Sequence, residues 1–288
     1  MARRRKHHQR SLLAPLGILT VLVAVVVVLG AVVWHLLTGQ QVLLIPPSEQ
    51  CIVTVGATTA SLDPDQSVNA AIIVAESIRR GLPPRAASIA LATAMQESGL
   101  HNLDHGDRDS VGLFQQRPSQ GWGTAANLMD PWYAAGKFYD ALVTVANWET
   151  GDINNVAQAV QHSGVPNGYQ KHVDAARAFA SALTGYSPAA ISCVSRATGP
   201  GSTVALATFL HRGFPSLHTA GSGSTLEVTT TDQHTQWAVA QLAMMSTGSY
   251  GVDAVTVGQR SWHNDGQHVA TWATATTPAP GVRIAVRG

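Results

Sequence analysis

The middle of the chain alternates between helical apolar segments and short polar breaks. Leu62-Asp63-Pro64-Asp65 is a helix start signal, and it predicts a helix over about 66–80 that ends at Gly81. Pro83-Pro84 opens a second segment, 85–98, which is apolar on nearly every face. A helix that is apolar all round is a buried helix. Further helices are expected near 131–144, 153–162 and 167–183, so residues 51–193 predict a mostly helical domain with a small β-hairpin.

The last part of the chain has a mixed pattern. A Gly/Ser/Pro-rich linker over 194–202 precedes it. The segment 226–230 is typical of a strand, and Thr231-Asp232 is expected to cap a helix through about Met245. Segments 252–257 and 282–286 alternate like half-buried strands. We expect a small α+β domain over 203–288, and the whole chain is expected to be of the α+β class.

The first fifty residues have a different charge and hydropathy pattern from the two predicted domains. Residues 1–10 are basic, and 11–37 contain no Asp, Glu, Lys or Arg. An apolar stretch of about 20 residues is long enough to cross a bilayer, whereas the apolar core of a cleaved signal peptide has about 7–15. The pattern predicts a single transmembrane helix over 11–38 and a stalk over 39–50. The positive-inside rule places the basic tail in the cytoplasm, so a single-pass cell-membrane protein with most of the chain outside is expected.

Charge narrows the function classes. Formal net charge is +1, and residues 1–10 contain five of the 18 basic residues. The rest of the chain therefore has 13 basic and 17 acidic residues. A mildly acidic domain has no electrostatic footprint for nucleic acid, so no nucleic-acid partner is expected. No nucleotide, flavin, haem or metal motif is present, so we expect no cofactor.

Two cysteines, Cys51 and Cys193, bracket the predicted helical domain. An even cysteine count outside the cytoplasm indicates a disulfide. Two unpaired buried thiols are the alternative.

Glu97 is the first candidate for chemistry, because it lies in the last turn of the buried apolar helix. Desolvation and the negative end of the helix dipole both disfavour its ionised form, which suits a general acid. A glutamate at a frayed helix end that points to water is the alternative. Glu97-Ser98 is followed, after a polar loop, by Gly112-Leu113-Phe114-Gln115, and Gln115 lies 18 residues after Glu97.

This pattern resembles the soluble lytic transglycosylase and goose-type lysozyme families, whose signature is Glu-Ser, a variable loop and Gly-Leu-Met-Gln. The segment 106–123 is also similar to a lysozyme-like group of actinobacterial envelope proteins. The resemblance covers about 51–193 and implies a lysozyme-like fold that cleaves the β-1,4 bond between N-acetylmuramic acid and N-acetylglucosamine in peptidoglycan. It implies Glu97 as the acid and base, Ser98 as its orienting residue and Gln115 as a sugar contact. Single-glutamate chemistry with a 1,6-anhydro product, lytic transglycosylation, is expected.

Other polar and aromatic side chains are candidates for the cleft. Sugar faces stack on aromatic rings, and sugar hydroxyls pair with amides and guanidinium groups, which suggests Gln116, Arg117, Ser119 and Trp122. The family places Ala-Tyr-Asn-Ala-Gly on a later helix, with its Tyr against the catalytic Glu. Here the matching stretch has Val160 and Gln161, so Gln161 stands for the Asn and Tyr169 is the tyrosine expected to reach the site.

Hydrolysis remains an alternative outcome. Goose-type relatives can hold a water with an Asp, and Asp104, Asp107 and Asp109 lie in the polar loop. Asp107 and Asp109 are possible second carboxylates for a muramidase, while loop capping is their alternative role. His101 and His105 near these acids match no metal-ligand spacing.

The function therefore has three alternatives. The first is a peptidoglycan-cleaving enzyme. The second is a catalytically inactive lysozyme-like module that binds the wall or serves as a scaffold in a secretion or conjugation machine. The third is a structural protein with an envelope protein partner at 203–288, a domain for which we expect wall or partner binding.

Overall fold

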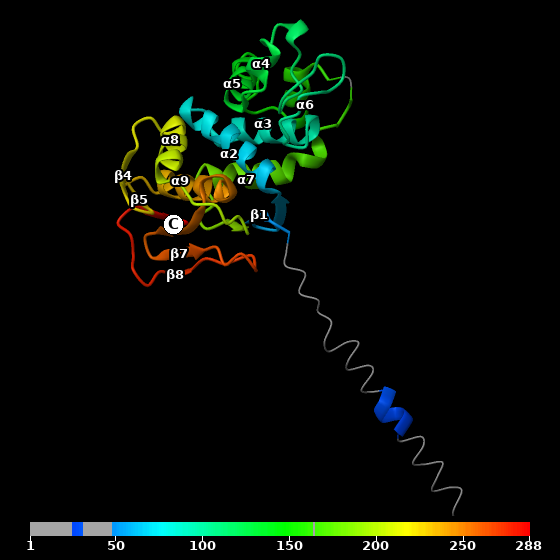
Figure 1. The fold of residues 1–288 in the computed structure, drawn as a ribbon. Coiled ribbons are helices and arrows are strands. Elements are labelled where there is room, and N and C mark those ends of the chain that lie inside the picture. The colour runs from blue at the N-terminus through cyan, green and yellow to red at the C-terminus, as the bar shows by residue number, and fades with distance from the viewer. Residues whose placement is uncertain (1–24, 31–47, 164) are drawn as a thin grey trace, which may run out of the picture. The chain divides into compact units, whose positions relative to one another are not determined.

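The computed structural model describes residues 25–30, 48–163 and 165–288. The chain divides into two units, Met1–Pro46 and Pro47–Gly288. In the first unit, residues 25–30 are helical. The second unit contains a three-stranded sheet, a group of helices and a six-stranded sheet (Figure 1).

The prediction of a membrane-spanning helix over 11–38, and with it a single-pass placement in a cell membrane, is corrected here. Among the described residues, no helix is both long and apolar enough to cross a bilayer. Residues 1–24 and 31–47, which include the predicted basic tail, most of the predicted stalk and the rest of 11–38, lie outside the described residues.

The small sheet opens the second unit. Its order is β2-β1-β3, formed by β1 (Gln50–Val55), β2 (Thr58–Leu62) and β3 (Ile191–Val194), and both pairings are antiparallel. β3 follows the helices in sequence, so this sheet joins the two ends of the helical part.

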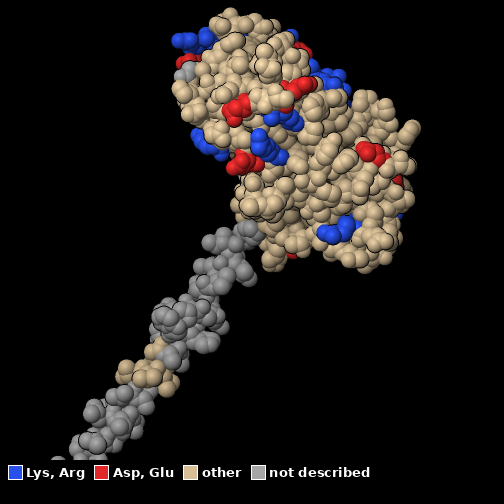
Figure 2. Space-filling view, turned by 180° about the vertical axis from the view of Figure 1, so that it is seen from behind, with Lys and Arg blue, Asp and Glu red and all other residues tan. Residues whose placement is uncertain are grey.

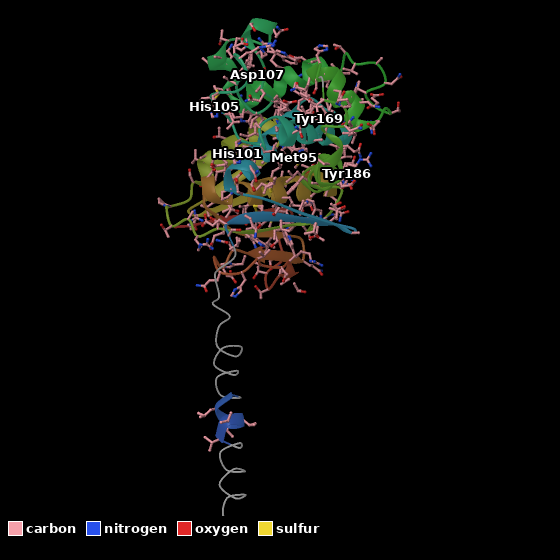
Figure 3. All side chains as sticks on the ribbon, turned by 90° about the vertical axis from the view of Figure 1, so that its right-hand side faces the viewer. Met95, His101, His105, Asp107, Tyr169 and Tyr186 are labelled. Carbon is pink, nitrogen blue, oxygen red and sulfur yellow. A yellow bond between two sulfur atoms is a disulfide. The ribbon has the colours of Figure 1, made fainter. Side chains whose placement is uncertain are left out.

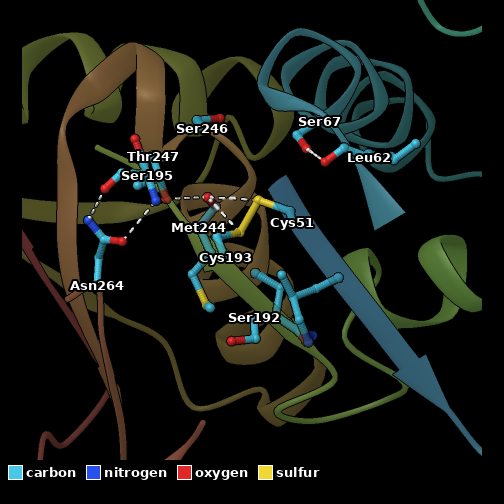
Figure 4. The surroundings of a disulfide bond; sticks show 12 residues. Cys51, Leu62, Ser67, Ser192, Cys193, Ser195, Met244, Ser246, Thr247 and Asn264 are labelled. Atoms are coloured by element: carbon cyan, nitrogen blue, oxygen red, sulfur yellow. Dashed lines mark hydrogen bonds between the residues drawn. A yellow bond between two sulfur atoms is a disulfide. The ribbon is translucent and has the colours of Figure 1, made fainter. Parts of the chain in front are cut away.

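Cys51 and Cys193 face each other across β1 and β3 and form a disulfide, as predicted (Figure 4). Both side chains are buried, at 5% and 0% exposure. The carbonyl oxygen of Met244 lies 3.3 Å from Cys193 Sγ. Just after β3, the Asn264 side chain accepts from the Ser195 N–H and donates to the Ser195 carbonyl. The disulfide therefore lies where the small sheet meets the C-terminal part.

Six α-helices follow β2 up to β3. They are α2 (Pro64–Arg79), α3 (Pro84–Glu97), α4 (Ala125–Leu128), α5 (Pro131–Leu142), α6 (Ile153–Gln161) and α7 (Val173–Leu183). Asp63 caps α2 in a capping box with Gln66, in which each side chain accepts from the other's backbone N–H at 2.9 Å. The helix expected over 167–183 begins later, at Val173, because a 3₁₀ turn over Gln170–His172 precedes it.

α3 is the buried centre of this group. Nine of its residues are buried, and it packs against α2, α5, α6 and α7. Its apolar character on every face, expected from the sequence, matches this central place. The helix carries Glu97 from the core to the surface at its C-terminal end.

The C-terminal part is α+β. Its helices are α8 (Thr203–Gly213), α9 (Gln233–Met245) and α10 (Thr247–Tyr250). The six-stranded antiparallel sheet has the order β4-β5-β9-β6-β7-β8, formed by β4 (His218–Ser222), β5 (Thr225–Thr229), β6 (Val252–Val257), β7 (Arg260–His263), β8 (Ala273–Thr274) and β9 (Val282–Val286). α9 packs against α7 and α2 on one side and against β6 and β9 on the other. The helical part and this part thus share one continuous core.

Candidate active site

Glu97 is the last residue of α3, and its side chain is partly exposed. The next residue, Ser98, is buried, and its hydroxyl donates to the Ala94 carbonyl at 3.1 Å and to the Leu113 carbonyl at 2.7 Å. Ser98 therefore ties the end of the helix to the Gly-Leu-Phe-Gln segment. Its contacts are to backbone, so any influence on the Glu97 carboxyl acts through the position of the helix end.

Tyr169 is the residue in direct contact with Glu97. Its hydroxyl donates to Glu97 Oε1 at 2.5 Å, and only 1% of Tyr169 is exposed. Burial, and after it the hydrogen bond to Glu97, raise the pKa of Tyr169 far above its ordinary value. The phenol therefore stays protonated and remains a donor. Among the described residues, Glu97 Oε2 has no hydrogen-bond partner.

Asn154 holds Tyr169 in this position. It is the second residue of α6 and is buried at 2% exposure, and its side-chain oxygen accepts from the Tyr169 N–H at 3.1 Å. Sequence reasoning did not select Asn154. Its only signal is a polar side chain near the start of an amphipathic helix, where capping and solvent exposure are the usual roles of asparagine.

The Gly-Leu-Phe-Gln segment forms a tight turn closed by a bridge between Val111 and Gln116. Gly112 has φ of 78°, and a Cβ at this position would lie 2.4 Å from the Leu128 carbonyl oxygen. Only glycine satisfies both the left-handed backbone and the close approach. Gln115 also has positive φ, at 47°. The 111–116 segment is therefore a turn closed by one antiparallel bridge, and Gly112 provides the backbone conformation that the turn requires.

The Gln115 side chain contacts the polar loop that contains His105. Its side-chain amide donates to the carbonyls of His105 and Gly112, both at 3.3 Å. Gly106 packs so closely on it that a Cβ there would lie 1.8 Å from Gln115 Oε1. In Figure 3 the loop residues His105 and Asp107 lie to the left of Tyr169. The structure therefore gives Gln115 contacts to the loop backbone.

Two other predicted site residues contact backbone as well. The Gln161 amide donates to the Phe114 carbonyl at 2.7 Å, and the buried Gln116 amide donates to the Ala134 carbonyl at 3.3 Å. The first bond ties α6 to the Gly-Leu-Phe-Gln turn, and the second ties the residue after that turn to α5. Trp122 is partly buried and packs against the core.

Asp109 and Arg117 form an ion pair with Nε and Oδ1 2.7 Å apart. Asp109 also accepts from the Ser119 N–H at 2.8 Å and from the Ser119 hydroxyl at 3.0 Å. The donation from Ser119, together with Arg117, holds the pKa of Asp109 well below its ordinary value. Asp109 is therefore ionised, and its contacts hold the loop to Arg117 and Ser119.

Asp104 and Asp107 are exposed. Asp104 pairs with His105 at 2.8 Å, and Asp107 lies 3.9 Å from Arg108. None of the three loop aspartates contacts Glu97 in the described part of the chain. The described residues also contain no group of three or more His, Cys, Asp or Glu side chains placed to hold a metal ion.

The geometry thus brings together one partly exposed carboxyl, a buried phenol that holds one of its oxygens, and a turn tied to the same helix end. Comparison with known proteins adds nothing to this: no family model and no curated protein matches the chain.

Proposed function

We propose that this chain cleaves the β-1,4 glycosidic bond of peptidoglycan, with Glu97 as its single acid and base. The contact between Tyr169 and Glu97 carries the proposal. A carboxyl group at the end of a buried helix is suited to exchange a proton with a bound substrate when a buried donor holds one oxygen and the other oxygen, as among the described residues here, has no protein partner.

In the proposed reaction, Glu97 Oε2 gives its proton to the glycosidic oxygen as the bond from that oxygen to C1 breaks. The carboxylate that results keeps the hydrogen bond from Tyr169, which stabilises its new charge. It then takes the proton of the sugar's own 6-hydroxyl while that oxygen bonds to C1. The products are a free 4-hydroxyl and a 1,6-anhydro end, and Glu97 regains its proton.

Lytic transglycosylation is favoured over hydrolysis by the carboxylates around the site. Hydrolysis by two carboxylates needs a second one placed to activate a water. Asp109 is held by Arg117 and Ser119, and Asp104 and Asp107 are exposed beside a histidine and an arginine respectively. The single-carboxyl reaction needs none of them.

A peptidoglycan digest tests the proposal. The full-length chain and its Glu97→Gln variant are incubated with purified peptidoglycan, and soluble fragments are analysed by mass spectrometry. We expect fragments with 1,6-anhydro ends from the wild type and a loss of about 10²–10⁴-fold in the variant, the usual contribution of a general acid. Circular dichroism should show the same fold for both.

Other outcomes point elsewhere. Reducing ends would identify a muramidase. Sedimentation of both proteins with peptidoglycan, without release of fragments from either, would contradict cleavage and favour a wall-binding module.

A further inference from the structure

A groove follows the junction of the helical and C-terminal parts. It consists of two hollows of about 390 and 550 Å³, which share Ile78, Phe214 and Thr235 in their walls. The first hollow also contains Pro84, the first residue of α3, and Tyr186 just after α7. The groove therefore begins at the end of α3 opposite Glu97, about 20 Å away along the helix axis.

A stacked aromatic pair, Tyr186 and His234, lies at one end of the groove. Tyr186 is 57% exposed, and its ring stacks on the His234 imidazole with centroids 4.2 Å apart and an interplanar angle of 28°. The Tyr186 N–H donates to the Ser181 carbonyl at 2.9 Å. Gly185 has φ of 84°, and a Cβ there would lie 1.9 Å from the His234 carbonyl oxygen. The backbone on both sides of the pair is thus fixed before any ligand arrives.

The lining of the groove contains the imidazoles of His218 and His234, no full-time charge among the described residues, and several free hydroxyls. Among the described residues that form its walls, none is an aspartate, glutamate, lysine or arginine. Within the described part of the chain, the hydroxyls of Ser216, Thr229 and Thr231 have no hydrogen-bond partner, nor does that of Tyr186.

The aromatic pair, the lining without aspartate, glutamate, lysine or arginine side chains and the free hydroxyls together indicate which class of ligand fits the groove. A charged polymer would lose its hydration in this groove without gaining an opposite charge. A neutral sugar presents one apolar ring face, which stacks on an aromatic side chain, and hydroxyls that pair with threonine and serine. Acetamido methyl groups fit apolar walls such as those of Ile78 and Phe214.

We propose that the groove between Tyr186 and Thr229 is a second glycan-binding site, which takes an uncharged, N-acetylated oligosaccharide at a distance from Glu97. The choice of an N-acetylated glycan rests on the proposed function, because peptidoglycan supplies such chains. The binding itself does not require cleavage. The site would hold a glycan strand by its uncharged backbone and leave its charged peptide stems in solvent.

The test uses the full-length Glu97→Gln chain and the N-acetylglucosamine hexamer as the probe. The chain has five tyrosines, so a spectrum with ¹³C-labelled tyrosine rings has few signals. Tyr186 reports the groove and Tyr169 reports the Glu97 site in one experiment. We expect saturable shifts of the Tyr186 signal, which is assigned by its absence in Tyr186→Phe.

Affinity measured by calorimetry gives the second readout. Tyr186→Ala should weaken hexamer binding at the groove about tenfold, the usual effect of removing an aromatic anchor. Tyr186→Phe should restore it, because the stacking face is kept. Val204→Ala, which removes a 76% exposed apolar side chain of α8 outside the groove, is the control and should bind as the parent chain does.

Shifts confined to Tyr169 would overturn the proposal, as would shifts of Tyr186 with an uncharged, proline-rich peptide but not with the hexamer. Failure of the proposed function is distinguishable. If the wild type releases no fragments from peptidoglycan while Tyr186 still responds to the hexamer, the groove stands and the cleavage proposal fails.

Discussion

Tyr169 Oη and Glu97 Oε1 are 2.5 Å apart, although 72 residues separate them in the sequence. The phenol comes from the loop before α7, and the carboxyl comes from the end of α3. Because Tyr169 is buried and Glu97 is partly exposed, the hydrogen bond connects the core to the surface. The proposed reaction relies on this contact to fix which carboxyl oxygen faces the substrate.

Removal of this hydroxyl should slow cleavage without unfolding the chain. Tyr169→Phe keeps the buried ring and loses one hydrogen bond to a charged group, a loss of about 1.5–3 kcal/mol. We expect kcat for fragment release to fall about 10- to 100-fold, with little change in KM. Tyr139→Phe is the matched control, since its hydroxyl donates to the Ile73 carbonyl in the core and has no contact with Glu97. Equal activity of Tyr169→Phe and wild type would remove Tyr169 from the mechanism.

A variant of Asp109 can distinguish cleavage by Glu97 alone from hydrolysis that uses a second carboxylate. Asp109→Asn keeps the shape and an oxygen acceptor for Ser119 but loses the ion pair with Arg117. If Asp109 only supports the loop, fragment release should stay within about fivefold of wild type and the products should keep 1,6-anhydro ends. Mass spectrometry of the digest checks both. A loss as large as that of Glu97→Gln would instead identify Asp109 as a second reacting carboxylate.

The disulfide should contribute a large part of the stability. It closes a loop between residues 142 positions apart, and the chain-entropy relation gives about 4–5 kcal/mol for a loop of this length. Cys51→Ser should therefore lower the free energy of unfolding by about 2–5 kcal/mol in urea titrations. The same experiment with reductant should destabilise the wild type and leave Cys51→Ser unchanged. Equal stability of the oxidised and reduced wild type would show that the β1–β3 pairing holds without the bond.

The surroundings of Glu76 predict that the folded state loses stability as the pH becomes acidic. Burial alone raises the pKa of this carboxyl, but hydrogen bonds from Arg79 and Arg80 outweigh it and hold the pKa below the ordinary 4.5. A lowered pKa in the folded state means that its contribution is complete above about pH 4.5 and is lost as the pH falls through the folded value.

Glu76→Gln should therefore destabilise the chain by about 3 kcal/mol at neutral pH, because Arg79 and Arg80 each lose their ion pair with Glu76, and the difference should shrink below about pH 4.5. Urea unfolding from about pH 3 to pH 7 measures it. Asp140→Asn is the comparison, since its carboxylate is 55% exposed where it meets Arg80 and should matter by less than about 1 kcal/mol. A constant difference between Glu76→Gln and wild type at all pH values would contradict this account.

Local patterns in the sequence determined much of the fold. Pro-Pro before an apolar run predicted the start of α3, and the Leu62-Asp63-Pro64-Asp65 signal predicted a helix start, because proline geometry and side-chain caps act within one turn of the backbone. α2 begins at Pro64, two residues before the expected start at about Gln66. The alternation at 252–257 and 282–286 predicted two strands with the bounds observed for β6 and β9. Two cysteines allow one pairing, and the predicted disulfide is present.

The N-terminal apolar segment shows the limit of such patterns. Its composition predicted a spanning helix, and no helix among the described residues meets the length and apolarity that a span requires.

Only the tertiary structure decided what the site side chains contact. Gln115, Gln116 and Gln161 have the residue types of sugar ligands, but their amides bond to nearby backbone carbonyls. Whether an amide faces a cleft or a carbonyl depends on the chain packed beside it, which no local pattern contains. The same holds for Asn154 and Tyr169, and for the groove at Tyr186. The Tyr169–Glu97 and Gln161–Phe114 bonds join segments 72 and 47 positions apart in the sequence, so they are set by how these segments pack rather than by residue type.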